Sequence, residues 1–360
     1  MSNSLALVAG IFAAGTVVGL IIAQSGSVAR AHETALAAAQ SADEEVWSWD
    51  EARRLSVELP AIEFQPHYKS KFVTVKGHKI HYMEAGKGDP IVFVHGNPEA
   101  PYIWRNIMPH LEKYGRVLAP SLIGMGKSEK ADLPYNYADF YDHLEGWIEA
   151  LDLKNITFVI HDWGSVMGLD YARQHEKNVK GVAMMETLIM PAYPINDPEA
   201  FRKVKPSVIA MYERNKSGGG YDDVVVQNYF IEMTLPGHTL RRLRQAEMNH
   251  YREPFKDPKH RKPLLQWPVL IPINGEPKET HDVITAINTW LPNKKIPTLH
   301  LYGEPGDVNS VDDVMWLAER LPNHQTQYIG PALHFVQEDQ PKIIGRTIAD
   351  WYRRNIATKK

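Results

Sequence analysis

The sequence contains no cysteine among its 360 residues. This absence excludes disulfide bonds, thiolate metal sites and cysteine nucleophiles, and it leaves the cellular compartment open. The chain also lacks a strong excess of charge of either sign, since 40 basic residues stand against 43 acidic ones and the formal net charge is −3. Because the lysines and arginines are scattered along the chain, no basic patch predicts a nucleic-acid partner.

One long uncharged stretch stands out from an otherwise ordinary composition. Residues 4–23 read SLALVAGIFAAGTVVGLIIA, and a helix of that length would span about 30 Å, the thickness of a bilayer core. The stretch is longer than the apolar part of a typical secretory signal, so we expect residues 1–26 to anchor the protein in a membrane. The alternative is export after cleavage at the small-residue sequence ARA, 29–31. Residues 27–66 are expected to be a spacer with a short helix.

From residue 67 the pattern changes to short apolar runs separated by helical lengths. Two alternating runs around the sequence KGHK predict a hairpin at 71–86. Further strands are predicted at 90–96, 116–124, 156–162, 179–186, 296–303 and 326–330. Helical spacing of apolar residues between these runs, for example at 137–151 and 164–175, predicts a mostly parallel sheet with helices on both faces.

The connection between residues 186 and 296 is much longer than a normal crossover. It is rich in Met, Tyr, Trp and Pro, and we expect 188–273 to form a helical cap. This cap would be inserted into a core made of 67–187 and 274–360. Since ligands of open α/β sheets bind at the carboxyl ends of the strands, the cap would enclose the binding site.

The stretch FVIHDWGS at 158–165 places Asp162 between a predicted strand and a helix. Many hydrolases present a nucleophile on such a turn, whereas a helix N-cap is the simpler interpretation of an aspartate there. A carboxylate that attacks a saturated carbon bearing a leaving group forms an alkyl ester, which water can then hydrolyse. Asp162 as a nucleophile therefore predicts an alkyl halide or an epoxide as substrate.

Further candidate residues would complete such a site, and most of them lie at the ends of other strands. His334 follows the last predicted strand and is the candidate base. Its orienting acid is either Glu186 or Asp307, and spacing alone does not choose between them. Asn97 and Trp163 carry N–H groups that could hold a departing halide ion, and their backbone N–H groups would form an oxyanion hole.

Seven segments in order resemble the haloalkane dehalogenases of the α/β-hydrolase superfamily: HGNP, LIGMGKS, HDWGS, MMET, LQWPVLIPI, GEPG and GPALHFVQED, within about residues 67–357. The resemblance implies the α/β-hydrolase fold, a small apolar halogenated substrate, water as co-substrate, and neither metal nor organic cofactor. It favours Glu186 over Asp307 as the acid. The implied site comprises the nucleophile Asp162, the base His334, the acid Glu186, the halide donors Asn97 and Trp163, and the pocket residues Trp267 and Pro268.

Two positions depart from the pattern of that family. Ile160 stands where a small residue is usual, and Ser121 stands where an aspartate is expected, which predicts a looser turn at that point. Two other activities also fit the residues. The cap sequences FIEMTLPGHTLRRL and HYREPFKDP are similar to those of coelenterazine-type luciferases, and an epoxide hydrolase would use the same aspartate with a tyrosine of the cap as proton donor. The oligomeric state is not predicted.

Overall fold

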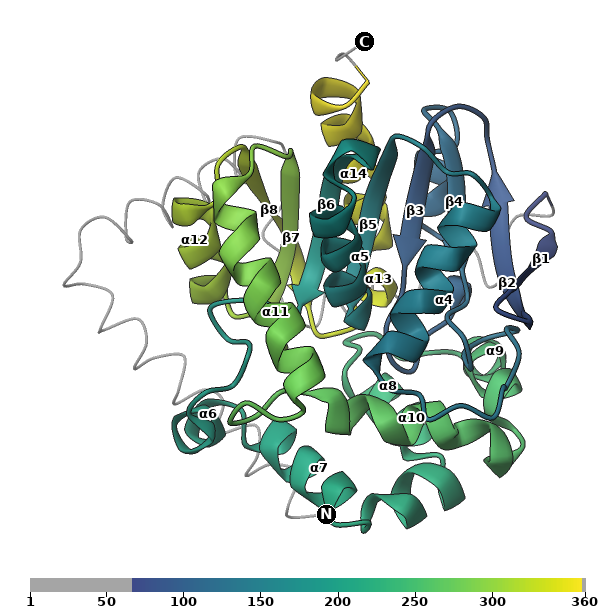
Figure 1. Ribbon diagram of the computed structural model, residues 1–360, viewed down its shortest axis with the longest axis vertical. Coiled ribbons are helices and arrows are strands. Elements are labelled where there is room, and N and C mark those ends of the chain that lie inside the picture. The colour runs from purple at the N-terminus through teal and green to yellow at the C-terminus, as the bar shows by residue number, and fades with distance from the viewer. Residues whose placement is uncertain (1–66, 358–360) are drawn as a thin grey trace. The chain divides into compact units, whose positions relative to one another are not determined.

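The computed structural model describes residues 67–357 (Figure 1). The predicted membrane anchor at 4–23 and the spacer at 27–66 lie outside the described residues. In the part of the chain that is described, no helix combines the length and the apolar character needed to cross a bilayer.

The described residues form one eight-stranded sheet with the strand order β1-β2-β4-β3-β5-β6-β7-β8. The hairpin strands β1 and β2 and the pair β2 and β4 are antiparallel, and the remaining neighbours are parallel. This arrangement confirms the predicted mostly parallel sheet. The strands are β1 (Ser70–Val75), β2 (His78–Ala85), β3 (Pro90–Val94), β4 (Arg116–Pro120), β5 (Ile156–Asp162), β6 (Val179–Thr187), β7 (Thr298–Pro305) and β8 (His324–Ala332).

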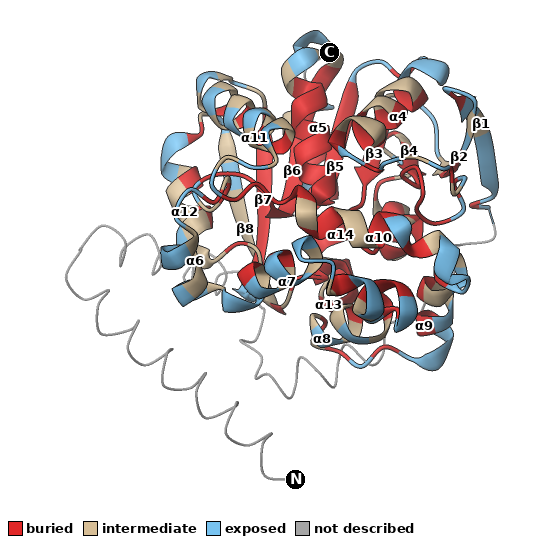
Figure 2. Cartoon of the chain, turned by 60° about the horizontal axis from the view of Figure 1, so that its bottom comes forward, coloured by how far each residue is buried: buried red, intermediate tan, exposed pale blue. Residues whose placement is uncertain are grey.

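Helices cover both faces of the sheet, which explains why its central strands are apolar throughout. Every residue of β3 and β5 is buried. Figure 1 shows α4, α5 and α11 in front of the sheet and α14 behind it, and Figure 2 shows burial concentrated in the central strands and α5. These helices are α4 (Tyr137–Ala150), α5 (Trp163–Gln174), α11 (Lys278–Trp290) and α14 (Pro341–Asn355). On α14 the residues Ile344, Ile348, Trp351 and Tyr352 form a buried apolar stripe.

The long connection between β6 and α11 consists mainly of short helices beyond the carboxyl ends of the strands (Figure 1). They include α6 (Pro198–Val204), α7 (Pro206–Lys216), α8 (Leu235–Gly237), α9 (Gln245–Arg252) and α10 (Lys262–Gln266). The cap and the core pack as one compact unit, so the distinction between them is one of chain topology. The limits 188 and 273 stay a prediction.

Four buried charged side chains join the cap to the core. Arg105 of the core binds Glu338 of α13 (Val336–Asp339) through two hydrogen bonds of 2.6 and 2.8 Å. Arg241 of the cap binds Glu247 of α9 through two hydrogen bonds of 3.0 and 2.9 Å. Arg105 also contacts Glu247, and Arg241 contacts Glu338, so each charge meets two partners of opposite sign. The two arginines and two glutamates together carry no net charge. Buried ions are tolerated when they are paired in this way.

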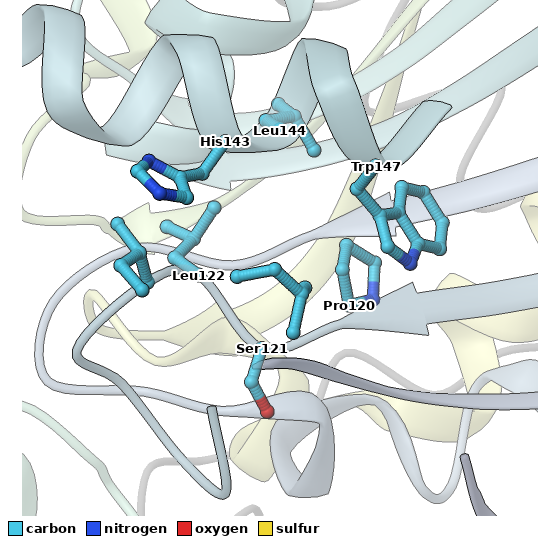
Figure 3. A pocket seen from close by; sticks show the side chains of 8 residues that line it. Pro120, Ser121, Leu122, His143, Leu144 and Trp147 are labelled. Carbon is cyan, nitrogen blue, oxygen red and sulfur yellow. The ribbon is translucent and has the colours of Figure 1, made fainter. Parts of the chain in front are cut away.

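The turn after β4 is firmly held, contrary to the expectation from Ser121. The backbone N–H of Ser121 donates to the His81 carbonyl at 2.8 Å, and the Ser128 hydroxyl donates to the Ser121 carbonyl at 2.7 Å. The Ser121 hydroxyl lies 2.9 Å from Nδ1 of His81 and points away from the ring of Trp147 (Figure 3). Burial, together with nearby lysines, lowers the pKa of His81 to about 3, so a neutral imidazole meets a neutral hydroxyl here.

Candidate active site

Asp162 lies at a sharp turn between the end of β5 and the start of α5. Its φ of 51° and ψ of −132° are strained for a residue with a side chain, a feature typical of nucleophile positions. The turn is closely packed and needs glycine at two nearby positions. A Cβ on Gly96, after β3, would lie 2.0 Å from Oδ1 of Asp162, and a Cβ on Gly164, in α5, would lie 2.3 Å from the Val94 carbonyl oxygen. The Asp162 side chain does not cap α5, which argues against the N-cap interpretation.

The two carboxylate oxygens of Asp162 face different partners. Oδ1 accepts the backbone N–H of Asn97 at 3.0 Å, and the backbone N–H of Trp163 also lies close to the carboxylate. Oδ2 lies 3.3 Å from Nε2 of His334. Burial raises the pKa of Asp162, but His334, His161 and the Trp163 N–H outweigh burial and hold the pKa below its ordinary value. The carboxylate is therefore ionised, with one oxygen held and the other turned toward the base.

Glu186 at the end of β6 lies on the other side of the His334 ring. Its Oε2 is 3.3 Å from Nδ1 of His334, and both residues are buried. The backbone N–H groups of Asp307 and Val308 donate to the same oxygen at 3.2 and 2.6 Å, which fixes the carboxylate. Burial lowers the pKa of His334, but Asp162 and Glu186 together raise it well above its ordinary value. The imidazole ring thus lies between two carboxylates.

The Asp307 carboxylate points to a different partner. Its Oδ2 binds Nδ1 of His238 in the cap, and its side chain is about one-third exposed. Burial raises the pKa of Asp307, but the contact with His238 lowers it below the ordinary value. Of the two candidate acids, the geometry favours Glu186, and Asp307 supports it through a backbone N–H.

The side chains of Asn97 and Trp163 are buried next to Asp162 with hydrogen-bonding capacity to spare. Among residues 67–357, Oδ1 of Asn97 is buried without a hydrogen-bond partner. The Trp163 ring lies 5.3 Å from the ring of Trp267, which is buried beside Pro268. Two neutral N–H donors against an aromatic wall suit a large, weakly hydrated anion.

Two buried residues of the site were missed by sequence reasoning. His161 precedes Asp162, and its Nε2 lies 2.8 Å from the His334 carbonyl oxygen. Its Nδ1 lies 2.7 Å from Oε1 of Glu99, whose Oε2 accepts the Gly96 N–H at 2.9 Å. In the sequence, Glu99 directly follows the motif HGNP and His161 is the first residue of HDWGS. These positions do not show that the two side chains meet.

By distance alone, Glu99, His161 and His334 could hold a metal ion, since one ligand-type atom of each lies within 4.8 Å of the others. Both ring nitrogens of His334 already face the carboxylates of Asp162 and Glu186. The ring nitrogens of His161 likewise face a carbonyl and a carboxylate oxygen. The cluster is therefore a set of protein contacts, and its nitrogens are not directed at a common centre.

The comparisons of this chain with a family model, with related sequences and with solved structures agree with one another. The model of the α/β hydrolase fold family matches residues 89–212. A haloalkane dehalogenase of Sphingobium indicum is 41% identical over 296 residues, which cover 81% of this chain and 97% of the relative. A haloalkane dehalogenase of Mycolicibacterium smegmatis is 37% identical over 80% of this chain and 92% of its own length. The crystal structure of a haloalkane dehalogenase loop variant from Bradyrhizobium elkanii superposes with a TM-score of 0.75 at 32% identity, covering 79% of this chain and 96% of that one.

Proposed function

This chain belongs to the haloalkane dehalogenase family, and we propose that it hydrolyses small apolar haloalkanes through an ester of Asp162. The overall reaction converts a haloalkane and water into an alcohol, a halide ion and a proton. The observation that carries this proposal is the Asp162 carboxylate itself. One of its oxygens is held by the backbone N–H of Asn97, the other faces His334, and two buried side chains with N–H donors lie beside it.

In the first step, Oδ2 of Asp162 attacks the saturated carbon that carries the halogen. A carbon–oxygen bond forms while the carbon–halogen bond breaks, and the electron pair leaves with the halide. The Asn97 amide and the Trp163 indole stabilise this anion as its charge develops, because both side chains are buried next to Asp162. A halide needs no proton to leave, so no general acid is required at this step.

In the second step, His334 removes a proton from water, and the hydroxide adds to Cγ of the Asp162 ester. The negative charge develops on Oδ1, which already accepts the backbone N–H of Asn97, and the backbone N–H of Trp163 lies close to the same carboxylate. Collapse of this intermediate breaks the bond between Cγ and Oδ2, so the alkoxide leaves with Oδ2 and takes its proton from His334, while the oxygen from water stays in the regenerated carboxylate. Glu186 orients the ring and stabilises the imidazolium.

The relatives compared above are all haloalkane dehalogenases, and the cap tyrosines give no support to epoxide hydrolysis. Ring opening needs a pair of cap tyrosines that bind and protonate the alkoxide in the site. Tyr221 and Tyr229 are 55% and 46% exposed, and the Tyr251 hydroxyl is bound to Glu338 in the buried charge network. The Tyr212 hydroxyl accepts from a lysine, which leaves Tyr193 without the second tyrosine of a ring-opening pair.

The proposal is tested by halide release from a panel of bromo- and chloroalkanes, with an epoxide and a luciferin run beside them. Wild-type protein should release halide, and Asp162→Ala and the isosteric Asp162→Asn should not. His334→Phe should release about one equivalent and then stop, leaving an alkyl-enzyme visible by intact mass. Halide release by Asp162→Ala at the wild-type rate would rule out the covalent route.

We further propose that residues 4–23 hold the enzyme at a membrane, on the strength of their length and lack of charge. After cell lysis, the full chain should sediment with membranes and resist a carbonate wash, whereas a chain without residues 1–26 should not. A mature N-terminus at residue 32 would instead show that the segment is a cleaved signal.

A further inference from the structure

The pair formed by Glu99 and His161 is fully buried and lies directly behind the residues that perform the chemistry. A buried acid and a buried base cost more to desolvate than an apolar pair of similar volume. Neither side chain lies among the groups assigned above to nucleophile, base, acid or halide binding. Their contacts therefore call for a role other than packing.

The hydrogen-bond partners of this pair define where one of its protons lies. Nε2 of His161 faces the His334 carbonyl oxygen, which can only accept, so Nε2 carries a proton. Nδ1 lies 2.7 Å from Oε1 of Glu99, a close contact that is poorly aligned for a hydrogen bond. The other oxygen of Glu99 accepts the Gly96 N–H. The pair therefore connects the backbone of Gly96 to the backbone of His334.

Through these contacts one buried pair touches three of the four segments that carry the catalytic groups. Glu99 binds the N–H of Gly96, the residue before Asn97. His161 is the residue before Asp162, and it holds the main chain of His334 itself, with the two imidazole rings 4.7 Å apart. The three segments are far apart in the sequence, and the contacts of Glu99 and His161 fix their relative positions.

We propose that Glu99 and His161 are positioning residues that hold the main chain of His334 in register with Asp162. The inference rests on the proposed function, because it concerns the same covalent cycle. A shift of a catalytic group by about 1 Å can cost on the order of a hundredfold in rate. His334 acts only in the second step, so loosening its main chain slows ester hydrolysis more than halide release.

A defect confined to the second step has a kinetic signature that general damage lacks. When hydrolysis of the ester slows, the alkyl-enzyme accumulates, and kcat and KM fall together while kcat/KM is preserved. General loss of structure lowers kcat/KM and the active fraction instead. The burst of halide in the first turnover separates the two cases, because it reports the first step alone.

The decisive comparison is Glu99→Ala against Glu99→Gln in the full chain. Glu99→Ala should lower kcat by at least about tenfold, keep kcat/KM within about threefold, and accumulate alkyl-enzyme detectable by intact mass. Glu99→Gln can still accept from Gly96 and donate to Nδ1 of a neutral His161, so its kcat should stay within about threefold of the wild type. Equal kcat in wild type and Glu99→Ala, or a parallel fall of kcat and kcat/KM without adduct, would overturn the inference.

A measurement on the unmodified protein keeps the inference testable if Glu99→Ala does not fold. Nitrogen-15 spectra of the histidine rings should show a His161 ring whose Nε2 carries a hydrogen-bonded proton, assigned by the single ring that changes in Glu99→Gln. A His161 ring without a proton on Nε2 would contradict the contact with the His334 main chain. Failure of the wild type to release halide would reject the proposed function and leave this spectral result standing.

Discussion

At the scale of single residues, the chemistry depends on how one negative charge on Asp162 governs the base. While Asp162 is ionised, it and Glu186 together raise the pKa of His334. Formation of the ester removes the charge of Asp162 and leaves Glu186 as the remaining carboxylate beside the ring. The pKa of His334 therefore falls at the point in the cycle when a neutral imidazole is needed to take a proton from water.

The role of Glu186 can be tested by the pH dependence of kcat. Removing its carboxylate charge in Glu186→Gln lowers the pKa of His334, because a contact that favours the imidazolium is lost. The base then stays neutral to lower pH, so the acid limb of kcat should move to lower pH while the maximal kcat falls. Asp307→Asn is the matched control and should leave the acid limb in place. A shift in Asp307→Asn and none in Glu186→Gln would make Asp307 the acid.

The role of Trp163 as a halide donor can be tested with two tryptophan substitutions. Trp163→Phe removes the buried indole N–H that follows the nucleophile, and removing one such donor costs on the order of a hundredfold in rate. We expect that loss in single-turnover halide release, together with loss of fluorescence quenching by bromide or iodide. Trp147→Phe, which removes a buried indole N–H outside the site, should keep most of the rate. Similar losses in both variants would indicate a packing effect.

At the scale of elements, the segment that carries His334 is held by the cap. The Asp339 carboxylate accepts the backbone N–H groups of Leu333 in the core and of Leu240 and Arg241 in the cap, at 3.1, 2.8 and 3.1 Å. The backbone N–H of Phe335 donates to the carbonyl of His238 at 3.1 Å. The cap therefore both encloses the site and fixes the loop of the base.

The buried charge network should dominate the stability of this contact between cap and core. Arg241→Met leaves Glu247 and Glu338 with too little positive charge in a buried setting, and breaking such a pair costs about 3–5 kcal/mol. The neighbouring Arg242 is exposed, and Arg242→Met should change the free energy of unfolding by less than about 0.5 kcal/mol. Urea unfolding of both variants measures the difference. Equal stabilities would mean that the network is compensated elsewhere.

At the scale of the whole molecule, every residue assigned to the site lies within 67–357. The Sphingobium indicum relative is matched over 97% of its length by 296 residues, which are 81% of this chain. The chain's N-terminal part is therefore expected to decide where the enzyme is held and to leave its chemistry unchanged.

A chain comprising residues 60–360 should keep the activity of the full chain. It contains all eight strands, the cap and the buried charge network, so its kcat for halide release should lie within about twofold of the full-length value. The measurement should be made in detergent for both chains, so that membrane attachment does not influence the comparison. A large loss in the shorter chain, with its fold intact by circular dichroism, would show that the N-terminal segment takes part in catalysis.

The sequence by itself determined the alternation of strands and helices and the order nucleophile, acid, base. These features follow from local spacing and from the rule that parallel strands end at one edge, which is why Asp162, His334 and Asn97 could be placed in advance. The family resemblance favoured Glu186 over Asp307, and the tertiary structure supplied the physical reason, because both follow strands and only packing directs one carboxylate to His334 and the other to His238. The contact between Glu99 and His161 was equally beyond the sequence, since residues so far apart meet only where the folded sheet brings their strands together.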